Sequence, residues 1–474
     1  METQQEGPVR RERSPGRRRV LIASVAGCAV LGGVLVLLPR ERPAGPARPS
    51  PGALAMEAVG GGVPAALPGL TELIEERREA VRTRPRDATS WAVLGAAYVE
   101  RGRRLSDPAD YPRAEKALRT SLSVRPERNT RALAGLAALS NARRDFPAAR
   151  RWGEAALKLE PRRWTTYPLL IDAYTGLGEY KAAKRTLDRL TGLRSGPAVL
   201  ARAAAVYRDR GWREDAAASL ADAAAGARAP AERAAYLERA GQLAFERGDL
   251  DVALRHFREA VRLDPDQWAA RAGQGRTLAA LGRTTQALNA YRAALAGQPC
   301  PQYALELGEL YESLGMPEAA RGRYGLLREG VRRAAKAGAD EELVLGRFEA
   351  DHGDPKAAVR RLRAEWKRQP GTEVADALGW ALYRAGEPAE ALRFALTATA
   401  VEPGGGVFDA ASMYHRGMIE RNLKRYGAAR RHLTEALRIN PHFSPLHAPA
   451  ARAAIEELGE PPDEGVPEMD GGAG

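Results

Sequence analysis

Apolar residues recur along most of the chain as pairs of short helical patterns. The clearest pair covers residues 231–265, AERAAYLERAGQLAFERGDLDVALRHFREAVRLDP. In its second half, large residues such as Phe257 alternate with small ones such as Ala253 and Ala260 at the spacing of one helix face. Pro265 ends the pattern, because proline cannot continue a helix and restricts the residue before it. The pattern predicts two helices joined by a tight turn.

The same pattern returns with a period near 34 residues, as in the prolines Pro265 and Pro299. One helical hairpin cannot bury its own apolar face, so a repeated hairpin predicts a stacked array. After a leading half-unit that ends at Pro85, we expect units to begin near residues 88, 130, 164, 197, 234, 268, 301, 339, 372 and 410. Insertions are expected at 104–111, 329–338 and 404–407, and a polar capping helix at about 448–458.

The recurring residues resemble those of the tetratricopeptide repeat (TPR) family. The best matches are Trp91, Leu94, Gly95 and Tyr98 in one unit, Leu307, Gly308, Tyr311, Gly315, Ala320 and Tyr324 in another, and Leu378, Gly379, Gly386, Ala391, Ala398 and Pro403 in a third. The resemblance implies an all-α fold for residues 69–458. That fold is a TPR-like α-solenoid, a right-handed superhelix of about ten helix-turn-helix repeats.

The resemblance also implies a concave groove that contacts extended peptides or partner helices. Carried onto this chain, the groove positions are Asn141, Asp172, Arg208, Gln242, Phe245, Arg276, Glu309, Glu312, Arg347, Trp380, Tyr383, Arg384, Arg421 and Asn422. Trp380, Tyr383, Arg384 and Arg421 are the most typical of a binding surface, because exposed aromatic and Arg side chains supply hot spots. Alternatively, the two aromatic residues pack against the next repeat. The family's clamp for acidic C-terminal peptides needs Lys and Asn where Ala92 and Ala96 stand, so that ligand is not predicted.

The N-terminal region reads as a membrane anchor. Residues 20–39 carry no charge and have the length of one membrane-spanning helix. The basic segment 1–19 precedes them, which favours a cytoplasmic N-terminus and a body on the other side. Residues 40–68, rich in Pro, Gly and Ala, are expected to form a linker. The alternatives are a cleaved signal peptide and a lipoprotein modified at Cys28.

Charge is unevenly distributed. The chain has a net charge of +13, of which residues 1–43 contribute +4 and residues 456–474 contribute −7, leaving +16 for the rest. This predicts acidic partners or an anionic surface, or else the solvated surface of a protein from a GC-rich genome. The acidic tail, residues 459–474, is expected to be disordered.

No catalytic or cofactor motif is found. The six His lack further ligands at metal-binding spacing, and the only cysteines are Cys28 and Cys300. The sequence GQGRT at 273–277 lies within a helical pattern instead of between a strand and a helix, so it does not indicate a dinucleotide site. We therefore expect no enzyme activity, no cofactor, no metal and no nucleic-acid ligand.

Together these features predict a single-pass bacterial membrane protein with an extracytoplasmic repeat body. Its expected function is that of a non-catalytic scaffold or adaptor, which binds a protein partner through the groove. Two alternatives remain. One is a cytoplasm-facing repeat body that recruits soluble proteins, and the other is a basic envelope-surface module that binds an anionic polymer or lipid.

Overall fold

The computed structural model describes residues 49–400 and 409–459, and every regular element within these ranges is a helix. The described residues from Ser50 onward belong to one compact unit. The predicted N-terminal segments 1–19 and 20–39, Cys28, the 404–407 insertion and the acidic tail beyond Gly459 lie outside the described residues. Within the described ranges, no helix combines the length and the apolar composition that a membrane crossing needs.

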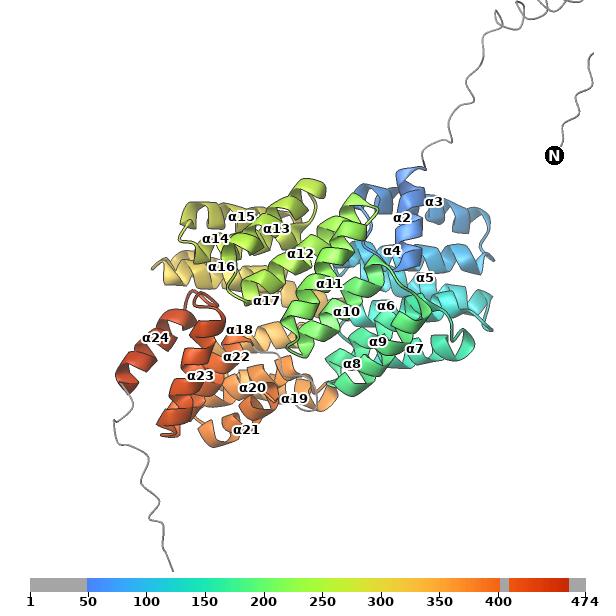
Figure 1. Cartoon of the computed structure of the whole chain (residues 1–474). Coiled ribbons are helices and arrows are strands. Elements are labelled where there is room, and N and C mark those ends of the chain that lie inside the picture. Colours follow the sequence, from blue (N-terminus) through green and yellow to red (C-terminus); the bar gives the residue numbers. More distant parts are fainter. Residues whose placement is uncertain (1–48, 401–408, 460–474) are drawn as a thin grey trace, which may run out of the picture. The chain divides into compact units, whose positions relative to one another are not determined.

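The helices pair in chain order into antiparallel hairpins, which can be followed from α2 to α23 in Figure 1. The first helices are α2 (Pro51–Gly61), α4 (Ala88–Leu105), α6 (Thr130–Ala142), α8 (Tyr167–Gly176), α10 (Pro197–Asp209), α12 (Pro230–Glu246), α14 (Trp268–Ala280), α16 (Pro301–Ser313), α18 (Glu342–His352), α20 (Thr372–Arg384) and α22 (Ala410–Asn422). The second helices are α3 (Leu67–Thr83), α5 (Asp110–Val124), α7 (Phe146–Leu159), α9 (Tyr180–Leu193), α11 (Arg213–Gly226), α13 (Leu250–Leu263), α15 (Thr284–Gly297), α17 (Pro317–Lys336), α19 (Pro355–Arg368), α21 (Pro388–Ala398) and α23 (Tyr426–Ile439). A short 3-10 helix, η1 (Trp164–Thr166), precedes α8, and α24 (His447–Leu458) follows the last hairpin.

The predicted all-α helical repeat solenoid is confirmed for the described residues. The expected unit starts near 88, 130, 197, 268, 301, 372 and 410 coincide with the first residues of first helices. The units expected near 164, 234 and 339 begin within a few residues of those positions. The 329–338 insertion is mostly helical, because α17 continues to Lys336 and is longer than the other second helices.

The linker predicted for residues 40–68 is wrong over part of its length, because residues 51–61 form α2. Ser50 caps this helix by accepting a hydrogen bond from the Ala53 N–H, and Pro51 occupies its first position. Helix α2 packs closely on α3, since a Cβ at Gly69 would lie 2.5 Å from the Pro51 oxygen. The leading half-unit is therefore the second helix of a complete hairpin.

In several hairpins a glycine of the first helix faces a large residue of the second. A Cβ at Gly308 would lie 2.2 Å from the Tyr324 ring, and one at Gly241 would lie 2.7 Å from the Phe257 ring. The Gly of the repeat pattern is thus set by close packing, as the sequence predicts.

The array also coils back on itself, which the sequence did not predict. The turn inside a hairpin meets the junction that follows the fifth hairpin after it, or in the case of the α4–α5 turn also the fourth, and we call these pairs turn–junction contacts. In one, the Arg143 oxygen at the α6–α7 turn accepts a hydrogen bond from the Asp340 N–H at the α17–α18 junction (2.9 Å). In another, the Asn440 amide after α23 donates to the Phe245 oxygen near the end of α12 (2.7 Å).

Further turn–junction contacts join the first and middle hairpins. The Gln298 amide donates to the Ser106 hydroxyl (2.9 Å). Arg104, at the end of α4, pairs with Asp264 at 2.6 Å, and both side chains are almost fully buried. Gly178 has a positive φ of 71°, and a Cβ there would lie 2.4 Å from the Pro370 oxygen, so only glycine fits this contact.

The residue before the unit-ending proline differs between junctions that make turn–junction contacts and junctions that do not. In the later repeats this residue is uncharged or acidic and buried, as for Asp264, Gln298, Gln369 and Asn440. At the corresponding early junctions it is charged and exposed, as for Arg84, Arg125 and Glu160. The difference follows from the coiling, because only the later junctions dock against an earlier turn.

Candidate functional site

The array encloses an inner cavity of about 870 Å³. Its walls come mainly from the first helices, from α2 to α22, with contributions from the α2–α3 and α19–α20 junctions and from the start of α24. Sites of this size accept small molecules or short chain segments. The cavity lies on the side of the first helices, where the resemblance implies a concave groove.

Six of the fourteen predicted groove residues line this cavity. They are Asn141, Asp172, Arg208, Glu309, Arg347 and Trp380. The remaining eight, which do not line it, are Gln242, Phe245, Arg276, Glu312, Tyr383, Arg384, Arg421 and Asn422. Asn422 is exposed at the end of α22, and Phe245 is buried beneath the Arg276 guanidinium.

Many predicted groove residues bind the neighbouring repeat. Arg208 of α10 pairs with Glu246 of α12 at 2.7 Å, and Arg276 of α14 pairs with Glu306 of α16 at 2.7 Å. Asp172 of α8 pairs in the same way with Arg202 of α10. Polar side chains on successive first helices therefore form a ladder along the concave face, and much of their hydrogen-bonding capacity is used inside the protein.

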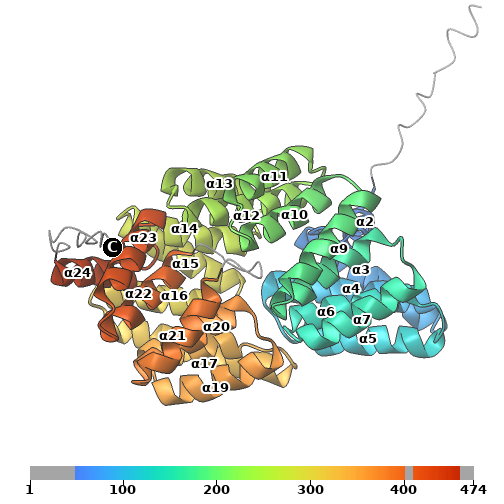
Figure 2. The same ribbon diagram turned by 60° about the horizontal axis from the view of Figure 1, so that its bottom comes forward.

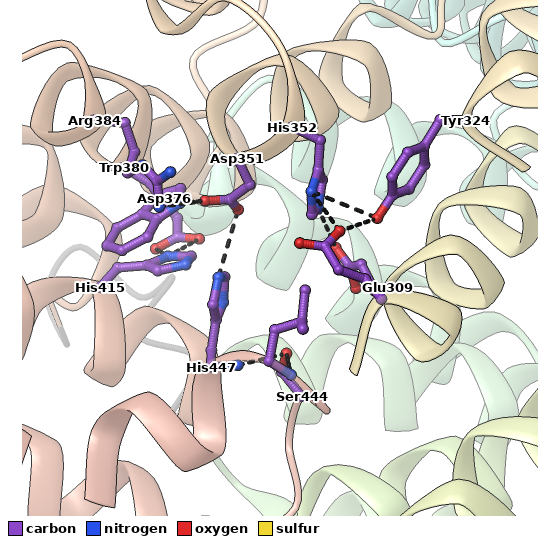
Figure 3. Close-up of polar contacts among 12 residues, drawn as sticks. Glu309, Tyr324, Asp351, His352, Asp376, Trp380, Arg384, His415, Ser444 and His447 are labelled. Carbon is purple, nitrogen blue, oxygen red and sulfur yellow. Dashed lines mark hydrogen bonds and ion pairs between the residues drawn. The ribbon is translucent and has the colours of Figure 1, made fainter. Parts of the chain in front are cut away.

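Trp380 belongs to a buried polar and aromatic cluster, shown in Figure 3. Only 3% of Trp380 is exposed, and its indole N–H donates to Asp351 of α18 (2.9 Å). The ring of His415 stacks on that of Trp380, with 4.3 Å between the ring centroids. The Asp376 carboxylate lies 3.0 Å from the Nδ1 of His415. Of the two interpretations of Trp380, packing against the next repeat is therefore the one found here.

The pKa values of two histidines in this cluster are shifted in opposite directions. Burial favours neutral His415, but the adjacent Asp376 carboxylate outweighs it and raises the pKa of His415. His447, at the first position of α24, lies 3.5 Å from Asp351. There burial prevails and lowers the pKa of His447 to about 4, despite the opposing Asp351 charge. His415 is thus stabilised as a cation and His447 as a neutral ring.

The C-terminal segment covers this end of the concave face. The ring of His447 stacks on Tyr414 at 4.9 Å, and that of Phe443 lies 5.7 Å from Tyr414. Arg421 is paired with Glu457 of α24. The predicted capping helix is present, and it contacts two residues of the predicted hot spot, Trp380 through His447 and Arg421 through Glu457. Arg384 stays exposed and pairs with Asp351 of α18.

Some cations of the cavity form no ion pair within the described ranges. They include Arg239 of α12 and Arg347 of α18, although the charge of Arg347 lowers the pKa of Glu373 and of Asp376. Asp209 also lines the cavity and lies 3.3 Å from Arg208. Burial raises the pKa of Asp209 to about 6, although Arg208 opposes the shift.

Sequence reasoning missed several residues that line the cavity. They include Arg202, Asp209, Arg239, Asp376, His415 and His447. Asp376 and His415 are one first-helix step apart in successive repeats, so their pairing could have been found by aligning the units. His447 could not, because its place depends on how the last segment folds back.

Within the described ranges, no group of three or more His, Cys, Asp or Glu side chains is arranged to hold a metal ion. Cys300 is half-buried at the start of α16, and burial raises the pKa of its thiol to about 12. A thiol of that pKa is not activated as a nucleophile.

Three segments of the chain match the family model described as tetratricopeptide repeat, namely residues 238–288, 272–330 and 377–442. They cover hairpins from α12 to α17 and from α20 to α23. A comparison with curated proteins finds no match.

Several solved structures are similar to this chain. The human IFIT1 dimer with PPP-AAAA is 17% identical, with a TM-score of 0.45, and the match covers 67% of this chain and 73% of that one. The Cut9–Hcn1 hetero-tetramer of the APC/C is 15% identical, with a TM-score of 0.38 and coverage of 83% and 82%. A tetratricopeptide repeat protein from Parabacteroides merdae is 18% identical, with a TM-score of 0.33 and coverage of 55% and 98%. Similarity at this level does not identify a function.

Proposed function

We propose that this chain, whose residues 238–330 and 377–442 are tetratricopeptide repeats, is a non-catalytic scaffold that binds a protein partner in its inner cavity. TPR repeats generally mediate protein–protein interaction, and the cavity lies on the side of the first helices. The observation that supports the proposal most directly is that Arg239 and Arg347 line the cavity without an ion-pair partner among the described residues. Both side chains are half-buried, and a ligand carboxylate that pairs with them would form charge-assisted hydrogen bonds that favour binding.

The cavity limits the form of the partner. Its volume of about 870 Å³ admits a short extended segment and excludes a folded domain. We therefore propose that the partner inserts a loop or a terminus.

The test is a photo-crosslinking side chain placed at Ala205, which lines the cavity, in cells that express the full chain. The control has the same side chain at Ala218, an exposed position on the outer face of the neighbouring helix α11. We expect a protein adduct at Ala205 that is absent at Ala218 and weakens when Arg239 and Arg347 are both replaced by Gln. Identical adducts at both positions would show that the cavity is not the binding site. So would an adduct at Ala205 whose yield does not change when Arg239 and Arg347 are replaced.

We further propose that the protein is a bacterial membrane protein anchored by residues 20–39, with the repeat body outside the cytoplasm. The support is the uncharged apolar run and the excess of Arg before it. Protease added to intact and to lysed protoplasts tests this topology. Degradation of the body in intact protoplasts agrees with it, whereas protection until lysis favours the cytoplasmic recruiter of soluble proteins.

A further inference from the structure

Positive charge is concentrated on two of the second helices. Helix α17 carries six basic and two acidic residues, and α19 carries six basic and one acidic residue. Among the other second helices α9 is the most basic, with four basic residues and one acidic residue, while α15 and α21 carry one basic residue each. A genome-wide preference for Arg would raise the number of basic residues in all these helices alike. The excess on α17 and α19 therefore needs another explanation.

The two helices are linked near their C-terminal ends. Helix α17 leads into residues 337–341, which contact α19 through the ion pair between Asp340 and Arg368. Both helices lie at the lower edge of Figure 2. We call their exposed side the α17/α19 surface.

The α17/α19 surface holds cations that are free to meet an external anion. Arg332, Lys336 and Lys367 are exposed and form no ion pair with any residue in 49–400 or 409–459. A second cavity, of about 460 Å³, opens on the same side and is lined by Arg360, Arg361 and Arg368. These three are already paired with Asp354, with Glu342 and Glu349, and with Asp340 and Glu365, respectively. The electrostatic attraction for an external anion therefore comes from the three unpaired cations.

Large apolar side chains are exposed on α17 and in the turn before it, and those in the turn lie at the opposite end of the helix from Arg332 and Lys336. Leu326, in the middle of α17, is 44% exposed, and Met316, in the turn just before α17, is 46% exposed. Leu314 in the same turn is 39% exposed. A helix that exposes both basic and apolar residues along its length is typical of surfaces that lie at the headgroup level of a bilayer, whereas a soluble polyanion gains nothing from the apolar residues.

From this combination we propose that the α17/α19 surface binds an anionic lipid membrane. The cations pair with lipid headgroups, and Leu314, Met316 and Leu326 enter the interfacial layer. The site is separate from the inner cavity and does not depend on residues 20–39. Failure of the proposed partner binding or of the proposed anchor would therefore leave this proposal unaffected, and the reverse is also true.

The experiment uses residues 50–474, the compact unit, without the apolar N-terminal run that would itself enter a bilayer. Far-UV circular dichroism and thermal unfolding first establish that this unit is folded. Flotation is then measured with vesicles of phosphatidylglycerol and phosphatidylcholine in equal parts, and with vesicles of phosphatidylcholine alone. We expect binding to the first only, and weaker binding as salt is raised above about 0.1 M, where the screening length is about 10 Å.

The decisive variant combines Arg332→Gln, Lys336→Gln and Lys367→Gln. At about 1 kcal/mol per basic residue near an anionic surface, we expect partitioning to fall about a hundredfold. The matched control combines Lys181→Gln, Arg185→Gln and Arg189→Gln, three exposed residues of α9 that also form no ion pair with described residues. It removes the same charge and should change partitioning only slightly.

Three outcomes would overturn the proposal. One is equal loss in both triple variants, which would mean that net charge alone drives binding. Another is equal binding to both kinds of vesicle, or none to either. The third is binding of soluble polyphosphate to the α17/α19 surface without vesicle binding, which would make the partner an anionic polymer.

Discussion

At the scale of single residues, glycines and aromatic side chains share the interior of several hairpins. Tyr324 fills the space that a Cβ at Gly308 would need, and Trp268 does the same at Gly297. Not all helical glycines have this role, since Gly322 in α17 has nothing within 4 Å of an added Cβ. The packing predicts opposite effects for the same substitution at two kinds of position.

We predict that Gly308→Ala destabilises the protein by about 1–3 kcal/mol, because the new methyl group overlaps the Tyr324 ring. Gly322→Ala should instead stabilise by about 0.5–1 kcal/mol, because alanine restricts the unfolded chain and favours helix. Denaturant unfolding measures both free energies. Effects of the same sign would contradict the packing described for Gly308.

A second residue-scale prediction concerns His447. Its folded pKa of about 4 lies below its usual value of 6.5, so its contribution to stability is present above about pH 6.5 and is lost as pH falls toward 4. Between pH 7 and pH 5 the loss should be about 1–2 kcal/mol. The free energy of unfolding of His447→Gln should fall less over the same interval. Equal falls in the two proteins would show that His447 protonates freely in the folded state.

At the scale of elements, the junctions between hairpins do more than connect helices. The buried pair between Arg104 and Asp264 fixes the end of α4 to the α13–α14 junction. Gln298 holds the next junction, two residues before Cys300, through the Ser106 hydroxyl. The thiol therefore reports on whether these turn–junction contacts are closed.

We predict that Arg104→Ala destabilises the protein by about 3 kcal/mol, because it leaves the Asp264 carboxylate buried without its partner. The Cys300 thiol should then be alkylated faster, since opening the contact relieves the burial that raises its pKa. The rate is measured in a Cys28→Ser background, where Cys300 is the only thiol. Arg82→Ala removes an exposed ion pair with Glu79 and should leave the rate unchanged, and a similar rise there would contradict the assignment.

The sequence predicts the hairpins well because their rules are local. A small residue facing a large one and a proline at each end can be read within one period, as at Gly308, Tyr324 and Pro299. Helix α2 was missed because its composition is that of a linker, while its stability comes from packing on α3. The predicted groove residues were placed on the correct helices, but their pairing across repeats, as between Arg208 and Glu246, depends on the stacking geometry.

At the scale of the whole array, the turn–junction contacts link residues far apart in sequence. Asn440 and Phe245 are separated by 195 positions, and so are Gln298 and Arg103. An open repeat array transmits a perturbation only to its neighbours. The coiled array described here should behave differently, because distant hairpins share hydrogen bonds.

We therefore predict that Asn440→Ala speeds amide hydrogen exchange at the α12–α13 turn as well as at the adjacent α23–α24 junction. The substitution leaves the buried Phe245 oxygen without its donor. Arg125→Ala alters the corresponding position at an early junction, where the side chain is exposed, and should change exchange only locally. A purely local effect of Asn440→Ala would mean that the distant contact carries no stability.

The turn–junction contacts also constrain how such a gene can change. In many repeat proteins, loss or duplication of one unit is tolerated because each unit interacts only with its neighbours. Here, loss of one hairpin between α14 and α17 would bring the later junctions one unit out of step with the turns they meet. Asn440 would no longer face Phe245, and the carbonyl of Pro370 would approach a turn without Gly178. Changes in length should therefore accumulate inside loops and helix ends, and the number of units should stay fixed.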